Sequence, residues 1–365
     1  RDLHKAIRRQ RQMCIRDSYK SKSYKKDIEI AVTASIGIEK LFGSSVLIAG
    51  GSGLIGSFIA DMLLWANSNM NANITVYAMD LSAERLAIRY AGIETDKLHL
   101  VEHNVNELPG FSFDVDYIIH AASPAFPAAF NSDPVGTVMS NILGTKQLLD
   151  YGKVHGAKRM LYISSGEVYG QGNLSLESFD ETYAGYVDPT SARSCYPNGK
   201  RAAETLCVSY TKQYELDTVI VRPSHTYGPT VTKVDNRANA QFVNKGLAGE
   251  NIVLNSAGNQ MRSYTYLADS ASAILSVLTS GESGNAYNIA NSQSRTTIAG
   301  FAKEVAAQTG TRVIFADPDE IAKAEMTPIA KQVLNSKKLE ALGWQGQFTV
   351  EEGIRHTLDI MRELD

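Results

Sequence analysis

A glycine-spaced turn between an apolar strand and a helix constrains this chain more than any other stretch. Residues 46–49 predict a buried strand, and residues 57–67 carry the apolar spacing of a helix. Glycine recurs at every third position between them, at Gly50, Gly53 and Gly56. Such a turn is tight, lets a phosphate approach bare backbone, and brings the helix close to the strand. It predicts a phosphate-binding helix N-terminus, although similar turns also occur for purely structural reasons.

The end of the next strand indicates which ligand that turn would bind. Residues 73–79 predict a second strand that ends at Asp80. An acidic residue in this place suits the ribose hydroxyls of an adenine dinucleotide, and its charge would repel a 2′-phosphate. The sequence therefore favours NAD over NADP, while a role for Asp80 as a turn residue or helix cap stays open.

Strand and helix patterns alternate steadily beyond this point. Further strands are expected at residues 98–102, 117–120, 160–164 and 218–221, and helices at residues 135–155 and 202–214. The alternation predicts an α/β fold with a doubly wound parallel sheet. Small residues follow the strand at 117–120, where Ala121 and Ala122 would let a flat cofactor lie across the sheet edge.

Composition excludes several classes of function. The chain has 365 residues, of which 44% are hydrophobic and 21% charged, as in ordinary globular proteins. A formal net charge of -3 gives no reason to expect nucleic acid, and no apolar run is long enough to span a membrane. The three cysteines are too few and too scattered for a disulfide framework or a zinc site, so we expect no metal and a reducing, cytoplasmic setting.

The N-terminal residues 1–40 are predicted to be a basic extension, disordered or artefactual. Arg and Lys cluster in residues 1–26 with little apolar periodicity. Residues 13–18, Met-Cys-Ile-Arg-Asp-Ser, resemble a translated sequencing adapter, so roughly the first 25 residues are left out of the functional reasoning.

A serine, a tyrosine and a lysine form the constellation that indicates chemistry. Tyr196 and Lys200 are four residues apart, and Ser165 stands upstream at the end of a predicted strand. A tyrosine with a pKa near 10 is a poor base at neutral pH. A neighbouring ammonium and a positive nicotinamide ring would lower that pKa, so the phenolate could take a proton from a sugar hydroxyl. A surface Tyr-Lys pair at helical spacing is the alternative.

From about residue 44 to 290, and more loosely to the C-terminus, the chain resembles an extended short-chain dehydrogenase/reductase. Within that group it is similar to the NAD-dependent nucleotide-sugar epimerases, dehydratases and decarboxylases. The motifs that are closest to UDP-glucuronate decarboxylases are His-Ala-Ala-Ser-Pro-Ala-Phe-Pro at 120–127, Arg-Ser-Cys-Tyr-Pro-Asn-Gly-Lys-Arg at 193–201, Asp-Asn-Arg at 235–237 and Gln-Met-Arg-Ser-Tyr at 260–264.

The resemblance implies a fold and a set of site residues. The fold would be a Rossmann domain over residues 41–222, to which a late strand near 284–291 returns, and a smaller α/β substrate lobe over most of residues 223–365. The cofactor-binding residues would be Gly50, Gly53, Leu54, Ile55, Gly56, Asp80, Asn104, Ala121, Ala122, Tyr196 and Lys200. The catalytic residues would be Ser165, Glu167, Tyr196 and Lys200, and the substrate-binding residues Ser123, His225, Arg237 and Arg262. A homodimer is also implied.

The chain departs from the family pattern at several of these positions. Gly166 replaces a Ser of the decarboxylases and an Asp of the dTDP-glucose 4,6-dehydratases, and Asn104 replaces an Asp near the adenine. His225 stands where an Asn usually contacts the nucleotide-sugar. Pro197 disfavours helical geometry at Tyr196, so we expect that tyrosine to cap the following helix.

The expected reaction begins with oxidation of C4 of a nucleotide-linked hexose, with Tyr196 as base and Ser165 as its partner. A 4-keto glucuronate is a β-keto acid and loses CO2 once it is oriented and shielded from water. Glu167 would be a further acid or base, and Arg262 and Arg237 would pair with the diphosphate or the carboxylate. A 4-epimerase, a 4,6-dehydratase and a non-catalytic NAD-binding sensor stay open as alternatives.

Overall fold

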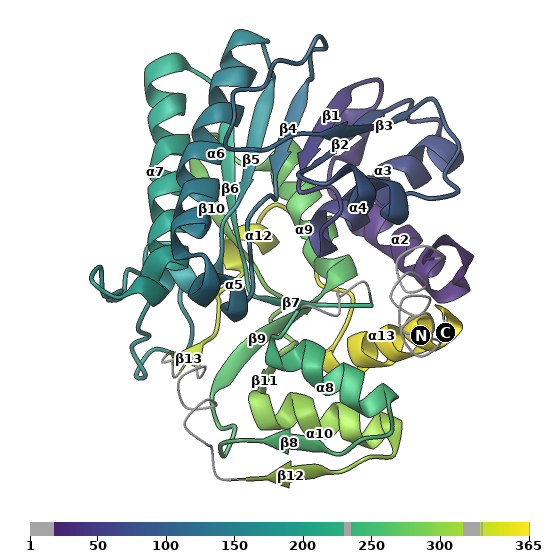
Figure 1. The fold of residues 1–365 in the computed structure, drawn as a ribbon, viewed down its shortest axis with the longest axis vertical. Helices are drawn as coiled ribbons and strands as arrows, with labels where there is room; N and C mark the ends of the chain where they lie inside the picture. Colours follow the sequence, from purple (N-terminus) through teal and green to yellow (C-terminus); the bar gives the residue numbers. More distant parts are fainter. Residues whose placement is uncertain (1–17, 230–234, 317–328, 330, 365) are drawn as a thin grey trace, which may run out of the picture.

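A seven-stranded parallel sheet forms the centre of the larger lobe (Figure 1). The computed structural model describes residues 18–229, 235–316, 329 and 331–364. The strand order is β10-β6-β5-β4-β1-β2-β3, and every pair is parallel. The strands are β1 (Ser45–Ala49), β2 (Thr75–Asp80), β3 (Leu98–Glu102), β4 (Tyr117–His120), β5 (Arg159–Ile163), β6 (Thr218–Pro223) and β10 (Asn285–Ile289). This order confirms the doubly wound α/β fold.

Helices cover both faces of the sheet because alternate strand residues point to opposite sides. Val46 and Ile48 belong to the core shared with α3 (Leu54–Met70) and α9 (Leu267–Ser280). Leu47 and Ala49 belong to the core beneath α6 (Pro134–Val154) and α7 (Cys195–Tyr214). The short helix α4 (Ala83–Arg89) packs against β2 and β3.

Helix α9 belongs to this larger lobe, which refines the expectation for residues 223–365. Every residue from Leu267 to Thr279 is buried, because the helix lies between the sheet and two other helices. Its buried polar side chains are hydrogen-bonded; the Asp269 carboxylate, for example, accepts from Asn291 and from the backbone N–H groups of Gln347 and Phe348. Strand β10 follows it and pairs with β6, as expected for a late strand near 284–291.

Residues 22–40 are ordered, in contrast to the disorder expected over residues 1–40. They form α2 (Lys22–Ala34) and the short helix η2 (Ile38–Leu41), after η1 (Ser18–Lys20). Tyr24, Ile28 and Val32 recur at helical spacing and are buried against α3 and α9. The sequence 13–18 that resembles an adapter lies outside the described residues, apart from Ser18.

The smaller lobe lies beyond the carboxyl ends of the central strands, at the lower end of Figure 1. Its four-stranded sheet contains β7 (His225–Tyr227), β9 (Met261–Tyr266), β11 (Arg295–Thr297) and β13 (Lys331–Gln332). A second pair joins β8 (Ile252–Leu254) and β12 (Val313–Phe315). Its helices are α8 (Ala238–Leu247), α10 (Ile298–Thr309) and α13 (Val350–Leu364), whereas α12 (Lys337–Glu340) packs against β10 of the central sheet. None of the helices in the described ranges has the length and apolar character that a bilayer span requires.

Candidate active site

A cavity of about 570 Å³ joins the two lobes at the carboxyl ends of the central strands. Ligands of doubly wound sheets bind at this edge. The predicted residues that line it are Gly50, Gly53, Leu54, Ile55, Gly56, Ala121, Ser123, Ser165, Glu167, Tyr196, Lys200, His225, Arg237 and Arg262. Asp80, Asn104 and Ala122 are near it in the fold but do not belong to this lining.

The glycine turn has the backbone geometry that its spacing predicts. Gly50 has a φ of +86°, and a Cβ atom there would lie 2.8 Å from the backbone of Ala121 and of Ala122. A Cβ atom on Gly56 would lie 2.4 Å from the carbonyl oxygen of Gly50. Side chains at these two positions would therefore force the strand, turn and helix apart. The turn leads into α3 at Leu54, so the first backbone amides of that helix face the cavity.

Asp80 supports the turn from the end of β2. Its Oδ2 atom accepts from the Ser52 hydroxyl at 2.6 Å and from the Ser52 backbone N–H at 3.3 Å. Arg85 lies 3.6 Å from the other carboxylate oxygen and reaches the cavity lining. Ser82, rather than Asp80, caps α4 by accepting from the Arg85 backbone N–H. Asn104 follows β3 and donates to Glu107 at 3.2 Å.

Ser165 and Glu167 are presented by the short helix η3 (Gly166–Tyr169) directly after β5. The Ser165 hydroxyl caps this helix by accepting from the Glu167 backbone N–H at 3.1 Å. Burial raises the pKa of the Glu167 carboxyl, while Arg193 and Arg262 act in the opposite direction. Nη2 of Arg193 is 3.2 Å from Oε2 of Glu167.

Tyr196 lies inside α7, which corrects the expectation that it caps the helix. The helix begins at Cys195, whose φ and ψ are helical, so Tyr196 and Pro197 both belong to its first turn. Proline is tolerated there because the first-turn amides of a helix have no internal acceptor. Burial, and next the Glu167 carboxylate, raise the pKa of Tyr196 to about 12, against the opposing effects of Ser165, Arg237 and Arg193.

Lys200 is buried one turn further along α7. Its ammonium donates to the carbonyl oxygen of Ile163 at 2.7 Å and lies 5.5 Å from the centre of the Tyr196 ring. Burial lowers the pKa of Lys200 to about 7, and Glu204 opposes this shift. The helical spacing thus places the lysine beside the tyrosine and beneath the end of β5.

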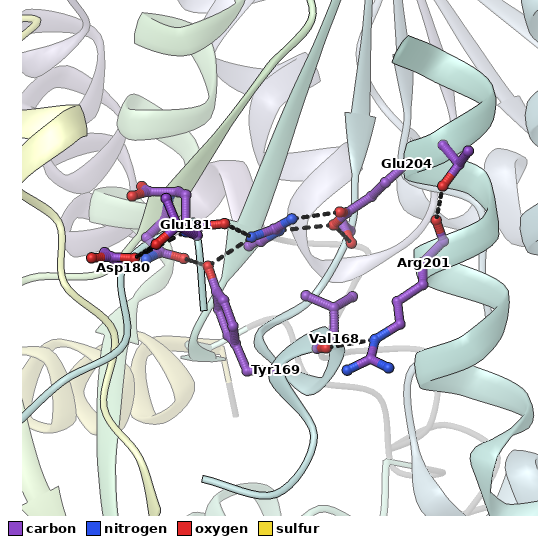
Figure 2. A network of polar contacts seen from close by, with 11 residues as sticks. Val168, Tyr169, Asp180, Glu181, Arg201 and Glu204 are labelled. Atoms are coloured by element: carbon purple, nitrogen blue, oxygen red, sulfur yellow. Dashed lines mark hydrogen bonds and ion pairs between the residues drawn. The ribbon is translucent and has the colours of Figure 1, made fainter. Parts of the chain in front are cut away.

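A buried polar network anchors the segment that carries Ser165 and Glu167 (Figure 2). Glu204 accepts from the Ser164 hydroxyl at 2.5 Å and forms a two-point ion pair with Arg222. The Arg222 guanidinium also donates to the Tyr169 hydroxyl at 3.0 Å and to the carbonyl oxygen of Glu181 at 2.8 Å. Both ends of η3 are therefore fixed to α7 and β6 by charge-assisted hydrogen bonds.

Two arginines and a histidine line the cavity on the side of the smaller lobe. Arg237 is held by Asp235, whose carboxylate accepts from Nε and Nη2 of the guanidinium. Arg262 is 1% exposed, and its guanidinium donates to the carbonyl oxygens of Met261 and Ile329, which carry no neutralising charge. Burial, and then the two arginines, lower the pKa of His225 to about 3, so its ring is neutral at physiological pH. Its Nδ1 atom has no hydrogen-bond partner among the described residues.

Sequence reasoning missed several residues of the cavity wall. Phe130, in the short helix α5 (Pro127–Ser132), stacks on Tyr196 with ring centres 4.5 Å apart. Gln332 of β13 faces Gly166. Neither residue belongs to a recognisable motif, because each reaches the cavity through a tertiary contact. Ser123, one of the predicted residues, is held at the wall by a hydrogen bond from Asn141 at 3.0 Å.

Comparison with known proteins places the chain among relatives of known activity. The sequence model of the NAD dependent epimerase/dehydratase family matches residues 46–290. UDP-glucuronic acid decarboxylase 6 of Arabidopsis thaliana is 32% identical over 86% of this chain and 88% of its own length. UDP-glucuronic acid decarboxylase 1 of Xenopus tropicalis is 30% identical over 87% of this chain and 72% of its own length.

Solved structures with the same fold include enzymes that act on nucleotide-sugars. The UDP-glucose 4-epimerase of Thermus thermophilus, in complex with NAD, has a TM-score of 0.71 and 25% identity, over 87% of this chain and 99% of that one. The UDP-glucuronic acid 4-epimerase of Bacillus cereus, in complex with UDP-glucuronic acid and NAD, has a TM-score of 0.73 and 20% identity, over 88% of this chain and 100% of that one.

Proposed function

Since the chain belongs to the NAD dependent epimerase/dehydratase family, we propose that it decarboxylates UDP-glucuronate through a 4-keto intermediate. The single observation that carries the proposal is the convergence of Ser165, Glu167, Tyr196 and Lys200 on the cavity that the glycine turn also lines. The relatives at 30% and 32% identity, both UDP-glucuronic acid decarboxylases, support this substrate.

The residues at the sheet edge fit an NAD molecule. The crowding around Gly50 and Gly56 leaves bare backbone toward the cavity, as a pyrophosphate requires. Asp80 would hold the adenosine ribose through its carboxylate, and Lys200 the nicotinamide ribose through its ammonium. Bound there, NAD supplies a reversible hydride acceptor for C4 of the sugar.

Tyr196 is the proposed base for the sugar hydroxyl. With a pKa of about 12, the phenol is protonated in the protein alone, so it becomes a base only when positive charge is added beside it. Lys200, with a pKa of about 7, can lose or regain a proton near neutrality and therefore adjusts that charge. Ser165 would hold the same sugar oxygen by a hydrogen bond while the proton moves to Tyr196 Oη.

The loss of CO2 asks little more of the protein than orientation. A carboxylate at C5 of a 4-keto sugar is β to the new carbonyl group, so the electrons of the C5–carboxylate bond can pass to the carbonyl oxygen as CO2 leaves. The resulting enolate would take up a proton at C5, and return of the hydride to C4 would give the pentose and restore the oxidised cofactor. Arg262 carries a buried charge whose protein partners are two neutral carbonyl oxygens, and it would bind the diphosphate or the carboxylate. The neutral His225 and the paired Arg237 would complete the contacts to the nucleotide-sugar.

The position of Gly166 disfavours dehydration as an alternative. A Cβ atom there would lie 3.1 Å from Nε2 of Gln332 and 3.3 Å from the carbonyl oxygen of Pro223. A dehydratase needs an Asp at this position to protonate the departing hydroxyl; this chain lacks it, and a side chain here would require Gln332 to shift. A 4-epimerase needs only Ser165, Tyr196, Lys200 and a sugar that can rotate, so it remains the second candidate.

Product analysis distinguishes these activities. The protein is loaded with NAD and incubated with UDP-glucuronate, UDP-glucose and dTDP-glucose, and the products are weighed by mass spectrometry. We expect loss of CO2 from UDP-glucuronate and no reaction of the other two sugars. Loss of water, or an unchanged mass with altered chromatographic retention, would replace the proposal by dehydration or epimerisation. If the protein binds NAD but converts none of the three sugars, the result would favour a non-catalytic NAD-binding sensor.

We also propose a cytoplasmic homodimer. Apolar side chains remain exposed on α6 and α7, which pack side by side; these are Val135, Met139, Val154, Val208 and Tyr214. A second copy of the same helix pair would cover them. Light scattering of the purified protein tests this, and Val208→Glu should convert a dimer into a monomer.

The proposed cytoplasmic location is supported by the cysteines. The buried free thiols of Cys195 and Cys207 suit a reducing compartment.

A further inference from the structure

Arg193 connects two walls of the cavity. It lies in the short helix η4 (Ala192–Ser194), immediately before α7. Its Nη2 atom is 3.3 Å and 3.2 Å from the two carboxylate oxygens of Glu167. Its guanidinium carbon is also 4.8 Å from the centre of the Phe130 ring. The same side chain therefore contacts η3, which carries Glu167, and α5, whose Phe130 also lines the cavity.

Phe130 contacts Tyr196 as well as Arg193, and so links the two residues. The two rings are nearly parallel, with 20° between their planes and 4.5 Å between their centres. Phe130 is 2% exposed and Tyr196 is 7% exposed, so neither ring can turn without displacing its neighbours. The Cys195 thiol, 3.9 Å from the carbonyl oxygen of Phe130, ties the start of α7 to the same helix.

Several charged and polar side chains surround Glu167 and Tyr196, and Arg193 is one of them. Glu167 faces Arg193 of η4 and Arg262 of β9. Tyr196 faces Ser165 and Glu167 from η3, Arg237 from the smaller lobe, Arg193, and the Lys200 ammonium of its own helix. Among these, Arg193 makes the direct ion pair with Glu167, so its loss would leave the half-buried carboxylate without this ion pair, with only the charge of Arg262 still acting on it.

We propose that Arg193 is a positioning residue of the active site: it holds the Glu167 carboxylate through an ion pair and, through Phe130, fixes the ring of Tyr196. This inference rests on the proposed function only in the kinetic experiment, which requires turnover of UDP-glucuronate. A merely structural tie between η4, η3 and α5 would change stability and leave the protonation of Glu167 as it is.

Four variants separate these roles. Arg193→Gln removes the charge and the stack, Arg193→Lys keeps only the charge, and Phe130→Leu keeps the ion pair but removes the stacked ring. The matched control is Arg295→Gln, which breaks another Arg–Glu pair, 3.0 Å from Glu177 and outside the cavity lining.

The kinetic experiment is the pH dependence of kcat for UDP-glucuronate with the NAD-loaded protein. In Arg193→Gln we expect kcat to fall by roughly 10- to 100-fold, the order expected when a catalytic group is misplaced by about 1 Å. The acidic limb of the profile should also move to higher pH, because Glu167 then protonates more readily. Arg193→Lys should restore the limb but only part of the rate, and Phe130→Leu should lower the rate without moving the limb. An unchanged profile in Arg193→Gln would overturn the proposal.

A second readout does not depend on turnover. Infrared difference spectra against Glu167→Gln report the protonated carboxyl group of Glu167. Followed as a function of pH, this signal should persist to higher pH in Arg193→Gln than in the wild-type protein or in Arg193→Lys. The same pH dependence in a folded Arg193→Gln as in wild type overturns the proposal even if no sugar is turned over, a result that would count against the proposed function separately. If Arg193→Gln does not fold, the rates of wild type, Arg193→Lys and Phe130→Leu decide: a kcat that stays at the wild-type value in both variants contradicts the proposal.

Discussion

The ammonium of Lys200 donates to the carbonyl oxygen of Ile163 at 2.7 Å, at the end of the central strand β5. Burial at this point lowers the pKa of Lys200 from 10.5 to about 7. At pH values between these two pKa values, Lys200 binds a proton more fully in the unfolded chain than in the folded one. The contribution of this group to stability therefore rises with pH over that window.

Lys200→Met removes this titration and should change the pH dependence of stability. The free energy of unfolding of the variant, relative to wild type, should decrease as pH rises from about 7 to about 10. Urea unfolding at several pH values measures it. Lys212→Met, on the exposed side of the same helix, is the matched control. A difference between Lys200→Met and wild type that stays constant with pH would contradict the assigned burial of the ammonium.

The Glu204–Arg222 ion pair should be strongly coupled. Both side chains are largely buried, and the pair joins α7 to β6 through two hydrogen bonds of 2.9 and 2.7 Å (Figure 2). Glu204→Gln leaves a buried guanidinium without its countercharge and should cost roughly 3 to 5 kcal/mol of stability. Adding Arg222→Met should recover much of that loss, which a double-mutant cycle by urea unfolding measures. Additive effects of the two substitutions would refute the coupling.

The N-terminal helix should make stability depend on the protonation of a histidine. Nδ1 of His356 on α13 lies 2.6 Å from Oδ1 of the buried Asp27 on α2, and this hydrogen bond raises the pKa of His356. The stabilisation is fully present below the ordinary histidine pKa of about 6.5 and is lost as pH rises through the raised value. His356→Gln should therefore lower Tm at about pH 6 by more than at about pH 9. An equal loss at both pH values would mean that the charge on His356 contributes nothing.

Much of the site could be predicted because its signals are local. The glycine turn, the strand-ending Ser165 and the four-residue spacing of Tyr196 and Lys200 each follow from backbone geometry within one element. The comparisons with known proteins confirm the family, the NAD cofactor and the fold that the motifs implied. The roles assigned to individual residues stay predictions.

The contacts that escaped prediction are non-local or hidden by composition. Helix α2 carries three lysines, which suggest a solvated tail, yet Tyr24, Ile28 and Val32 form an apolar face at helical spacing. Pro197 predicts that Tyr196 caps its helix, but the helix begins one residue earlier. The stack of Phe130 on Tyr196 joins residues far apart in the chain, and no sequence period encodes such a contact.

Tyr196 is the proposed base for the C4 hydroxyl of a nucleotide-linked glucuronate, and decarboxylation depends on the oxidation that follows. The most direct test compares NAD-loaded wild type and Tyr196→Phe on UDP-glucuronate, with product mass and retained NAD measured in the same samples. We predict that wild type yields a UDP-sugar lighter by one CO2, and that Tyr196→Phe retains NAD but leaves UDP-glucuronate unchanged. Loss of CO2 by Tyr196→Phe at the wild-type rate would contradict this role of Tyr196.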